Sequence, residues 1–279
     1  MTTIEDDLRS LAATAAQAPD LDAVLGRGTR LRQRRRRTWL GGAAVAVAGV
    51  LIAVPVMTLG GAPASTSAAS QFLSAVAQRA GAQPMVDPAT VPYWYSKSRV
   101  TTGGDTYTRQ VWLGHTRPGR LIQPDEPGPQ PLDVAVFPAG STGLSWDDLL
   151  TLPRDPDQLS AWLRQAVGDA GHDVDSEMFV AVGDLLRESP APPTLRQALY
   201  QVAAGIPDVA LAEGLTDAAG RPATAVSRQW PEGGGTQTYL IDVDTGALLQ
   251  ERDTNPDGTL AFQATYLQSG PVTTASAKP

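Results

Sequence analysis

The longest apolar stretch of the chain lies near its N-terminal end. Residues 38–60 include 22 consecutive uncharged residues, from Thr38 to Leu59. At about 1.5 Å of rise per residue, a helix of that length is roughly 33 Å long, enough to cross a hydrocarbon core of about 30 Å. The pattern therefore predicts one transmembrane helix over residues 38–60.

Four consecutive arginines stand directly before this stretch and predict its orientation. Basic residues next to a membrane helix are concentrated on the cytoplasmic side. We therefore expect residues 1–37 to be cytoplasmic and residues 61–279 to be extracytoplasmic, in a single-pass protein of the cell membrane. The orienting residues are Arg34, Arg35, Arg36 and Arg37.

A cleaved signal peptide is the alternative interpretation. Ala62-Pro63-Ala64 supplies the small residues of an export cleavage site, and Arg36-Arg37 matches part of a twin-arginine signal. The apolar stretch is, however, longer than the usual apolar region of about 7–15 residues in such signals. Both interpretations export the larger part of the chain.

Two short apolar stripes at helical spacing occur within residues 1–37. A segment of this length cannot bury a core alone, so the stripes need a protein partner or the bilayer surface. An anionic lipid surface favours basic residues on the polar face, whereas the first stripe is accompanied by Glu5, Asp6 and Asp7. We therefore predict that the stripes bind a cytoplasmic protein. The case is stronger for residues 3–16 than for residues 20–31, because Arg27, Arg30 and Arg32 make the second segment better suited to lipid. The first contains Ile4, Leu8 and Leu11, and the second contains Leu21, Val24 and Leu25.

Small residues recur along one side of the predicted membrane helix. Gly42, Ala46, Gly49 and Ala53 are spaced four, three and four residues apart. Such a seam allows two helices to approach closely, which predicts a weak homodimer through the membrane helix. Alanine is common throughout the chain, so this spacing of small residues can also arise from the high alanine content alone.

A linker and a folded domain follow the predicted span. Residues 61–68 are small and uncharged, as is typical of a linker. Residues 69–270 combine helical and strand patterns separated by short turns, and strands joined by short turns pair antiparallel. We therefore predict an α+β extracytoplasmic domain, with an antiparallel sheet of six to eight strands packed against helices, and a disordered tail over residues 271–279.

Within this domain, we expect the sheet to pack against the first helix and an inserted helical segment. Residues 117–131 contain five prolines and predict a loop with at most one short strand. Glycines 103 and 104 predict a hairpin turn between the first two strands. The expected helices are 69–80 and three segments within 146–205, and the expected strands are 93–102, 106–114 and five runs between 209 and 267.

Charge divides at the predicted membrane helix. Residues 1–37 hold eight arginines and five acidic residues, whereas residues 61–279 hold 14 basic and 24 acidic residues. An acidic exported domain has no basic footprint for nucleic acid, and the arginine cluster suits the lipid bilayer instead. The chain has no cysteine, which excludes disulfides and thiolate zinc sites.

The sequence offers no complete catalytic constellation, and we expect neither enzymatic activity nor a cofactor. The two histidines, His115 and His172, accompany no nucleophile motif. A metal site of these histidines with Asp173, Asp175 and Glu177 is the alternative to a solvated acidic loop. The stretch 253–258 opens like a calcium-binding loop, but its twelfth position is Ala264, where a glutamate is required.

Aromatic residues gather in the predicted domain and leave two interpretations open. They line an apolar pocket on a curved sheet, or they fill the core. Alternation places Trp94 on the opposite face from Tyr93 and Tyr95. The residues concerned are Tyr93, Trp94, Tyr95, Trp112, Trp146 and Trp162.

Several stretches of the domain carry a family resemblance. They are YWYSKSR, SWDDLLTLPRDPDQLSAWL, RQALYQVAAGIPDV, DAAGRPATAVS and LIDVDTGALLQE, within residues 90–255. In these stretches the chain resembles a family of actinobacterial single-pass membrane proteins that are typically encoded beside an extracytoplasmic-function sigma factor. The domain is also similar, more distantly, to the curved sheets of lipoprotein-carrier and RseB-type envelope proteins.

The resemblance implies a membrane-tethered regulator or sensor, similar to an anti-sigma factor, whose cytoplasmic helices hold a sigma factor. Zinc-type anti-sigma domains carry a histidine and paired cysteines, which residues 1–37 lack. A sigma factor would therefore have to be held by a minimal helical segment. The second likeness implies the alternative, an envelope protein that binds lipid or lipoprotein.

Overall fold

The computed structural model describes residues 67–279, apart from residues 85, 125–127, 169–172 and 232. The predicted cytoplasmic segment, the predicted membrane helix and most of the predicted linker lie outside the described residues. None of the helices that the structure describes is both long enough and apolar enough to span a membrane.

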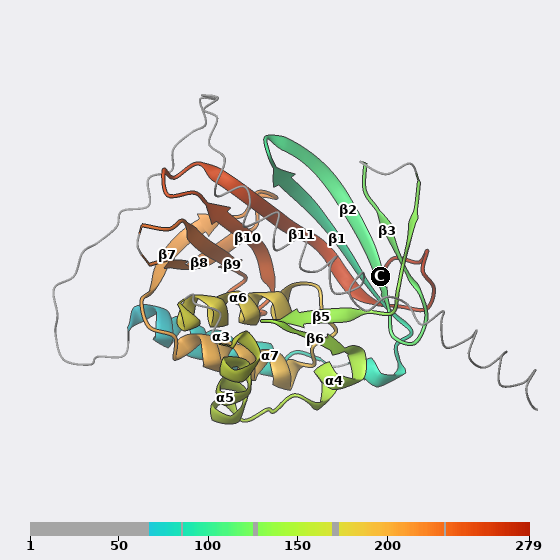
Figure 1. The fold of residues 1–279 in the computed structure, drawn as a ribbon, viewed down its shortest axis with the longest axis horizontal. Helices are drawn as coiled ribbons and strands as arrows, with labels where there is room; N and C mark the ends of the chain where they lie inside the picture. Colours follow the sequence, from blue (N-terminus) through green and yellow to red (C-terminus); the bar gives the residue numbers. More distant parts are fainter. Residues whose placement is uncertain (1–66, 85, 125–127, 169–172, 232) are drawn as a thin grey trace, which may run out of the picture. The chain divides into compact units, whose positions relative to one another are not determined.

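A nine-stranded antiparallel sheet forms the largest layer of the described domain (Figure 1). Its strand order is β4-β3-β2-β1-β11-β10-β9-β8-β7, so the first and last strands of the domain pair at its centre. With the helices described below, this confirms the predicted α+β class. The strands are β1 (Tyr93–Thr102), β2 (Asp105–Gly114), β3 (Gly119–Ile122), β4 (Gln130–Leu132), β7 (Val209–Thr216), β8 (Pro222–Gln229), β9 (Thr236–Ile241), β10 (Leu248–Thr254) and β11 (Leu260–Val272).

The predicted number of strands was too low, because β3 and β4 lie in the proline-rich stretch that we expected to be mostly loop. They are only four and three residues long, too short for a clear alternation of apolar and polar residues. Pro131 lies on the outermost strand, where its missing N–H removes no bond from the sheet interior. A separate hairpin is formed by β5 (Val136–Ala139) and β6 (Thr142–Ser145).

Local sequence explains where most of the helices begin. The side chains of Ser67, Ser145, Asp155 and Asp173 each accept a hydrogen bond from a backbone N–H in the first turn of the following helix. Such caps satisfy donors that the helix itself leaves unpaired. The helices are α3 (Ala68–Gly81), α4 (Trp146–Thr151), α5 (Pro156–Val167), α6 (Val174–Arg187) and α7 (Pro193–Ala204), with a short 3-10 helix η2 (Pro88–Thr90).

The helices cover one face of the sheet, here called the inner face (Figure 1). Helix α3 packs along α7, and side chains from alternate strand positions complete the main core. Leu73 of α3, Leu199 of α7 and Val226 of β8 are each at most 1% exposed. The predicted packing of the sheet against the first helix and an inserted helical segment is therefore confirmed.

The opposite face, here called the outer face, carries two smaller apolar clusters. One lies on β8, β9 and β10, and the other lies on β1, β2 and the end of β11. Ala275 and Ala277 pack against the second cluster. The first cluster contains Ala223, Ala225, Leu240 and Leu249, and the second contains Tyr95, Trp112 and Val272.

Candidate functional site

The interface between the helices and the inner face is closely packed. A cavity at its centre measures about 10 Å³ and is lined by apolar side chains, among them Leu73, Phe179 and Tyr239. Pockets for small ligands usually measure about 300–1,000 Å³. At this place, therefore, the concave side of the sheet holds core side chains rather than a preformed site for an acyl chain.

A buried ion cluster joins α6 to the inner face. Arg187 donates from Nη1 to both carboxylate oxygens of Glu251, at 2.9 and 3.1 Å, and its Nη2 lies 2.6 Å from Oδ1 of Asp184. The side chains of Glu251 and Asp184 are 2% and 5% exposed. Next to this cluster, Arg109 of β2 pairs with Glu188 at 2.6 Å.

The electrostatics of this cluster favour its charged form. Burial lowers the pKa of Arg187, but the carboxylates of Asp184 and Glu251 outweigh that effect and hold the pKa well above its ordinary value. Burial and the same carboxylates raise the pKa of Tyr239, whose hydroxyl donates to the carbonyl of Phe179 at 3.2 Å. The pairing of Arg187 with Glu251 therefore joins α6 to β10 of the sheet.

A second arginine, on the sheet, forms hydrogen bonds with the N-terminal end of α6. Arg228 of β8 is buried and donates from Nη2 to Oδ2 of Asp173 at 2.7 Å and from Nε to the hydroxyl of Ser176 at 3.0 Å. The hydroxyl of Ser176 also donates to Asp173 at 2.6 Å. This hydrogen bond, together with Arg228, lowers the pKa of the Asp173 carboxyl below its ordinary value.

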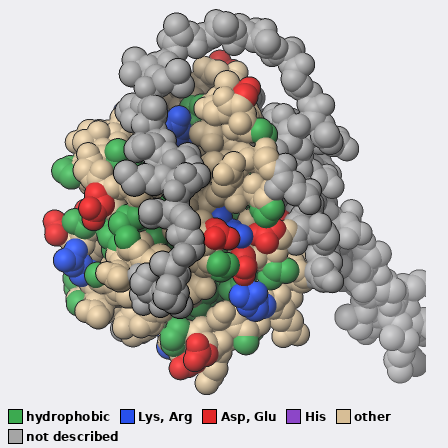
Figure 2. Space-filling model, turned by 90° about the vertical axis from the view of Figure 1, so that its left-hand side faces the viewer, with side chains coloured by type: hydrophobic (Ala, Val, Ile, Leu, Met, Phe, Trp, Pro, Cys, Tyr) green, Lys and Arg blue, Asp and Glu red, His purple; other side chains and the backbone are tan. Residues whose placement is uncertain are grey.

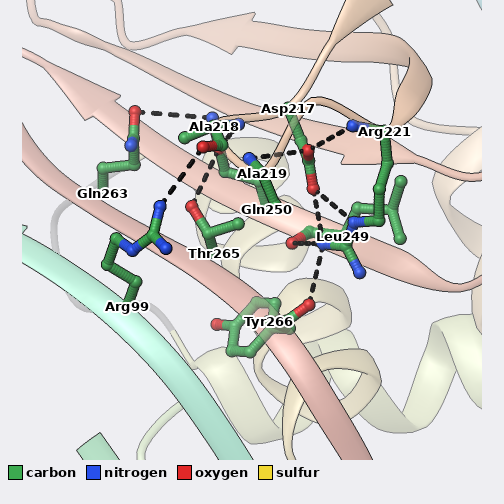
Figure 3. Close-up of polar contacts among 10 residues, drawn as sticks. All are labelled: Arg99, Asp217, Ala218, Ala219, Arg221, Leu249, Gln250, Gln263, Thr265 and Tyr266. Carbon is green, nitrogen blue, oxygen red and sulfur yellow. Dashed lines mark hydrogen bonds and ion pairs between the residues drawn. The ribbon is translucent and has the colours of Figure 1, made fainter. Parts of the chain in front are cut away.

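On the outer face, the turn between β7 and β8 folds back onto β10 and β11 (Figure 3). The fully buried carboxylate of Asp217 accepts from the backbone N–H groups of Ala219 and Arg221, each at 2.9 Å. Arg221 donates from Nε to Asp217 at 2.7 Å, and from Nη2 to the carbonyls of Leu249 and Tyr266.

The same turn is joined to the centre of the sheet by further hydrogen bonds (Figure 3). Gln250 accepts through Oε1 from Ala218 N at 2.8 Å and from the Thr265 hydroxyl at 3.0 Å. Arg99 donates to the carbonyl of Ala218 at 3.3 Å. Because every one of these groups is used in holding the turn, we assign this network to stability rather than to chemistry.

A different region of the outer face binds residues 273–279. We call it the tail-binding surface and define it by Tyr95, Trp112, Arg120 and Gln268. Tyr95 and Trp112 are opposite each other on β1 and β2, with ring centroids 5.0 Å apart. The guanidinium of Arg120 lies 5.5 Å from the centroid of the Trp112 ring. The surface thus combines aromatic area with side-chain donors.

Of the two interpretations of the aromatic residues, a single pocket is not what the structure shows, because the six residues are divided among different places. Tyr93, Tyr95 and Trp112 belong to the outer cluster, whereas Trp94 packs against the main core, as the alternation predicted. Trp146 is buried in that core. Trp162 lines an open groove of about 370 Å³ formed by β6, α4 and α5.

Among the described residues, the candidate metal ligands form no metal site. His115 stacks on Trp146, with ring centroids 4.8 Å apart, and its Nε2 lies 2.8 Å from Oδ1 of Asp147. His172 lies outside the described residues. Within the part of the chain that the structure describes, no group of three or more candidate ligands is placed to hold a metal ion. The turn at Asp257 is closed by Thr259, whose hydrogen bonds lower the pKa of Asp257.

The residues predicted to bind a partner, to orient the chain or to form a membrane dimer all precede residue 67 and lie outside the described residues. Their roles stay predictions. Sequence reasoning did not find the ion cluster at Arg187, the Asp217–Arg221 pair or the tail-binding surface. Of these three features, only the Asp217–Arg221 pair has a signal in the local sequence, because Asp217 and Gly220 flank a predicted turn. On the face shown in Figure 2, acidic and basic side chains of the described residues are interspersed.

Comparison with known proteins gives no family. Neither the scan against family models nor the search of curated proteins returns a match. Among solved structures, the MucA/MucB complex of Pseudomonas aeruginosa aligns with 76% of this chain and 59% of its own, at 16% identity and a TM-score of 0.34. A structure of MucB in complex with MucA(peri) aligns at 17% identity, a TM-score of 0.34 and 57% of its length.

A LolA superfamily protein of Nitrosomonas europaea is also similar, at 9% identity and a TM-score of 0.22, over 72% of this chain and 94% of that protein. These are distant similarities to MucB and to a LolA superfamily protein. The chain spans less than two thirds of the MucB structures it matches. At these TM-scores the similarities carry no functional argument, and the finer resemblance to an actinobacterial family stays a prediction.

Proposed function

We propose that the chain is a single-pass membrane protein of the cell envelope that acts as a regulator or sensor and has no catalytic activity. Residues 1–37 lie in the cytoplasm and hold a sigma factor, and the α+β domain lies outside the membrane. The domain works through contacts with other proteins.

One observation carries this proposal, the junction at which Arg34–Arg37 meet 22 uncharged residues. The junction predicts one crossing with a cytoplasmic N-terminal side. It leaves on that side a segment with two apolar stripes but too few residues to bury them. A short amphipathic segment of this kind suits docking into a groove of another protein.

At the interface between the helices and the sheet, the described domain does not offer what the alternative, a lipid or lipoprotein carrier, requires. A carrier needs an apolar cavity that takes up an acyl chain, and the cavity of about 10 Å³ between helices and sheet is smaller than a single methylene chain requires. The ion cluster of Arg187 and Glu251 also ties the helices to the sheet at this place. A surface that binds another protein, in contrast, needs no such cavity.

Reporter fusions to the whole chain test the topology. Alkaline phosphatase, active only outside the cytoplasm, is fused after Pro279 in one fusion and before Met1 in another. We expect activity from the first alone, and replacement of Arg34–Arg37 by glutamine should reduce it. An inactive C-terminal fusion beside an active N-terminal one would contradict the proposal, and a mature chain starting near Ser65 would establish the signal-peptide alternative.

A further inference from the structure

The open groove beside Trp162 differs from the closely packed interface under the sheet. Its walls are formed by β6, α4 and α5, which lie on the helical side of the domain (Figure 1). Its volume of about 370 Å³ lies within the range of about 300–1,000 Å³ that is usual for small-ligand sites. We call it the α4–α5 groove and define it by Thr142, Asp148, Leu152, Pro153 and Trp162.

Trp162 supplies the aromatic part of the groove. Leu159 and Leu163 lie on the buried face of α5 and are fully enclosed by the main core. Trp162 stands next to that face, so its side chain packs partly against the core and is only half-buried. A ring that is held on one side and open on the other is suited to contact with a ligand. Leu152 and Pro153 extend this apolar wall between α4 and α5.

Asp148 supplies the charge. Among the described residues that line the groove, Asp148 alone is ionisable. Its Oδ2 accepts from the Ser145 backbone N at 3.2 Å and from the Ser145 hydroxyl at 2.6 Å. Both bonds end at Oδ2 and leave Oδ1 for a ligand. The same bonds lower the pKa of the Asp148 carboxyl below its ordinary value, so the groove carries a negative charge at neutral pH.

The surroundings of the groove add to this negative charge. Residues 142–164 contain four aspartates and two arginines. Both arginines are already engaged: Arg154 donates to the carbonyls of Leu150 and Leu152, and Arg164 pairs with Asp175 at 3.1 Å. The groove therefore repels an anion and attracts a cation.

We infer that the α4–α5 groove is a binding site for a small quaternary ammonium compound. A cation is attracted to the face of an aromatic ring, and tryptophan gives the strongest attraction of this kind. The carboxylate of Asp148 neutralises the charge, while Leu152 and Pro153 accept methyl groups. A single carboxylate is too few ligands for a bare calcium ion, which takes six to eight oxygens. The inference rests on the described domain alone and stands independently of the membrane topology proposed above.

Ligand-observed NMR on the whole chain in a non-ionic detergent tests the inference. One probe is choline, and the other is its uncharged analogue, in which a carbon replaces the ammonium nitrogen. Saturation transfer from the protein to each probe is followed as the probe concentration rises. We expect choline to bind saturably and at least tenfold more tightly than the analogue, and added salt to weaken the binding of choline alone.

Matched variants locate the bound choline. Asp148→Asn removes the charge but keeps an oxygen for Ser145, and Trp162→Leu removes the ring but keeps an apolar side chain. Each should weaken choline binding at least fivefold. Asp157→Asn removes a charge from an exposed position of α5 outside the groove and should change the binding less than twofold.

A second pair of variants leaves the hydrogen bonds of Asp148 and the packing of Trp162 unaltered. Thr142 is exposed at the rim of the groove. Thr142→Lys adds a positive charge there and should weaken choline binding at least fivefold, whereas Thr142→Gln should change it less than twofold. This pair decides the question if thermal unfolding shows that the substitutions at Asp148 or Trp162 disrupt the fold.

Three outcomes would overturn the inference. Equal binding of choline and its uncharged analogue would show that the groove offers apolar contact only. Choline binding that is unchanged by Thr142→Lys and by the folded variants at Asp148 and Trp162 would place the cation elsewhere on the protein. Absence of saturable choline binding to the unaltered chain would show that the groove is not a site for this class of compound.

Discussion

Arg187 on α6 and Glu251 on β10 are 64 residues apart in the sequence, and the guanidinium of one donates to both carboxylate oxygens of the other. Asp184, one turn earlier on α6, contacts the same guanidinium. Because all three side chains are largely buried, the cluster fixes where the helix lies on the sheet.

Replacement of Glu251 by glutamine should therefore destabilise the domain by about 3 kcal/mol, because removing one partner of a buried pair leaves charge that water does not compensate. Urea unfolding of the two proteins measures the difference. The matched control is Asp147→Asn, which breaks the His115 pair at a carboxylate that is 78% exposed. We expect a change of at most about 0.5 kcal/mol there. Equal effects of the two substitutions would contradict the assigned role of the cluster.

The turn between β7 and β8 gives a second prediction. Asp217→Ala should cost about 2–4 kcal/mol, because two backbone N–H groups and Arg221 all lose a buried acceptor. Asp242 caps the turn between β9 and β10 in a similar way, accepting from Asp244 N and Thr245 N, but it is partly exposed. Asp242→Ala should cost about 1 kcal/mol by thermal unfolding, and a larger loss there than at Asp217 would be evidence against this account.

Asp173 predicts a dependence of stability on pH. Its pKa is lowered in the folded domain by Ser176 and Arg228. A lowered pKa stabilises the fold above the unfolded pKa of about 3.9, and this contribution disappears as the pH falls through the folded value. Asp173→Asn should therefore unfold at lower urea than the unaltered chain at pH 7 and pH 5.

The gap between the two urea midpoints should begin to shrink below about pH 4, where the unfolded chain takes up the proton, and it should close only below the lowered pKa of the folded domain. Asp155→Asn is the control, since Asp155 caps α5 through Gln158 N and asparagine caps equally well. We expect a smaller midpoint change for this variant at pH 7. A gap for Asp173→Asn that is as large at pH 3 as at pH 7 would show that the lost charge is not responsible.

The sequence predicts those parts of the fold that depend on local pattern. The sequence predicts both ends of strand β1, residues 93–102, correctly. The strand is followed by Gly103 and Gly104, which both have the positive φ angles that glycine adopts freely in a turn. Strands β3 and β4 were mostly missed because they are short and contain or adjoin proline and glycine. The sequence pattern of a strand needs several alternations, which three or four residues do not supply.

The contacts that form the candidate sites join residues that lie far apart in the sequence. Trp112 meets Ala277 across 165 residues, and neither residue carries a local signal for the other. Likewise, Ala275 and Ala277 pack against the cluster that includes Tyr95, which lies about 180 residues earlier in the chain. Only the fold brings these residues together, so no reading of residue types along the chain identifies the tail-binding surface.

Capture of a sigma factor by the whole chain tests the central claim most directly. The chain, tagged after Pro279 and solubilised in detergent, is mixed with each purified extracytoplasmic-function sigma factor of the cell, beside a variant with Leu8→Asp and Leu11→Asp. The account predicts that the unaltered chain retains one sigma factor and that the variant loses it by at least tenfold, because the stripe that includes Ile4 can no longer be buried. Retention of none of the sigma factors, or equal retention by the variant, would contradict it.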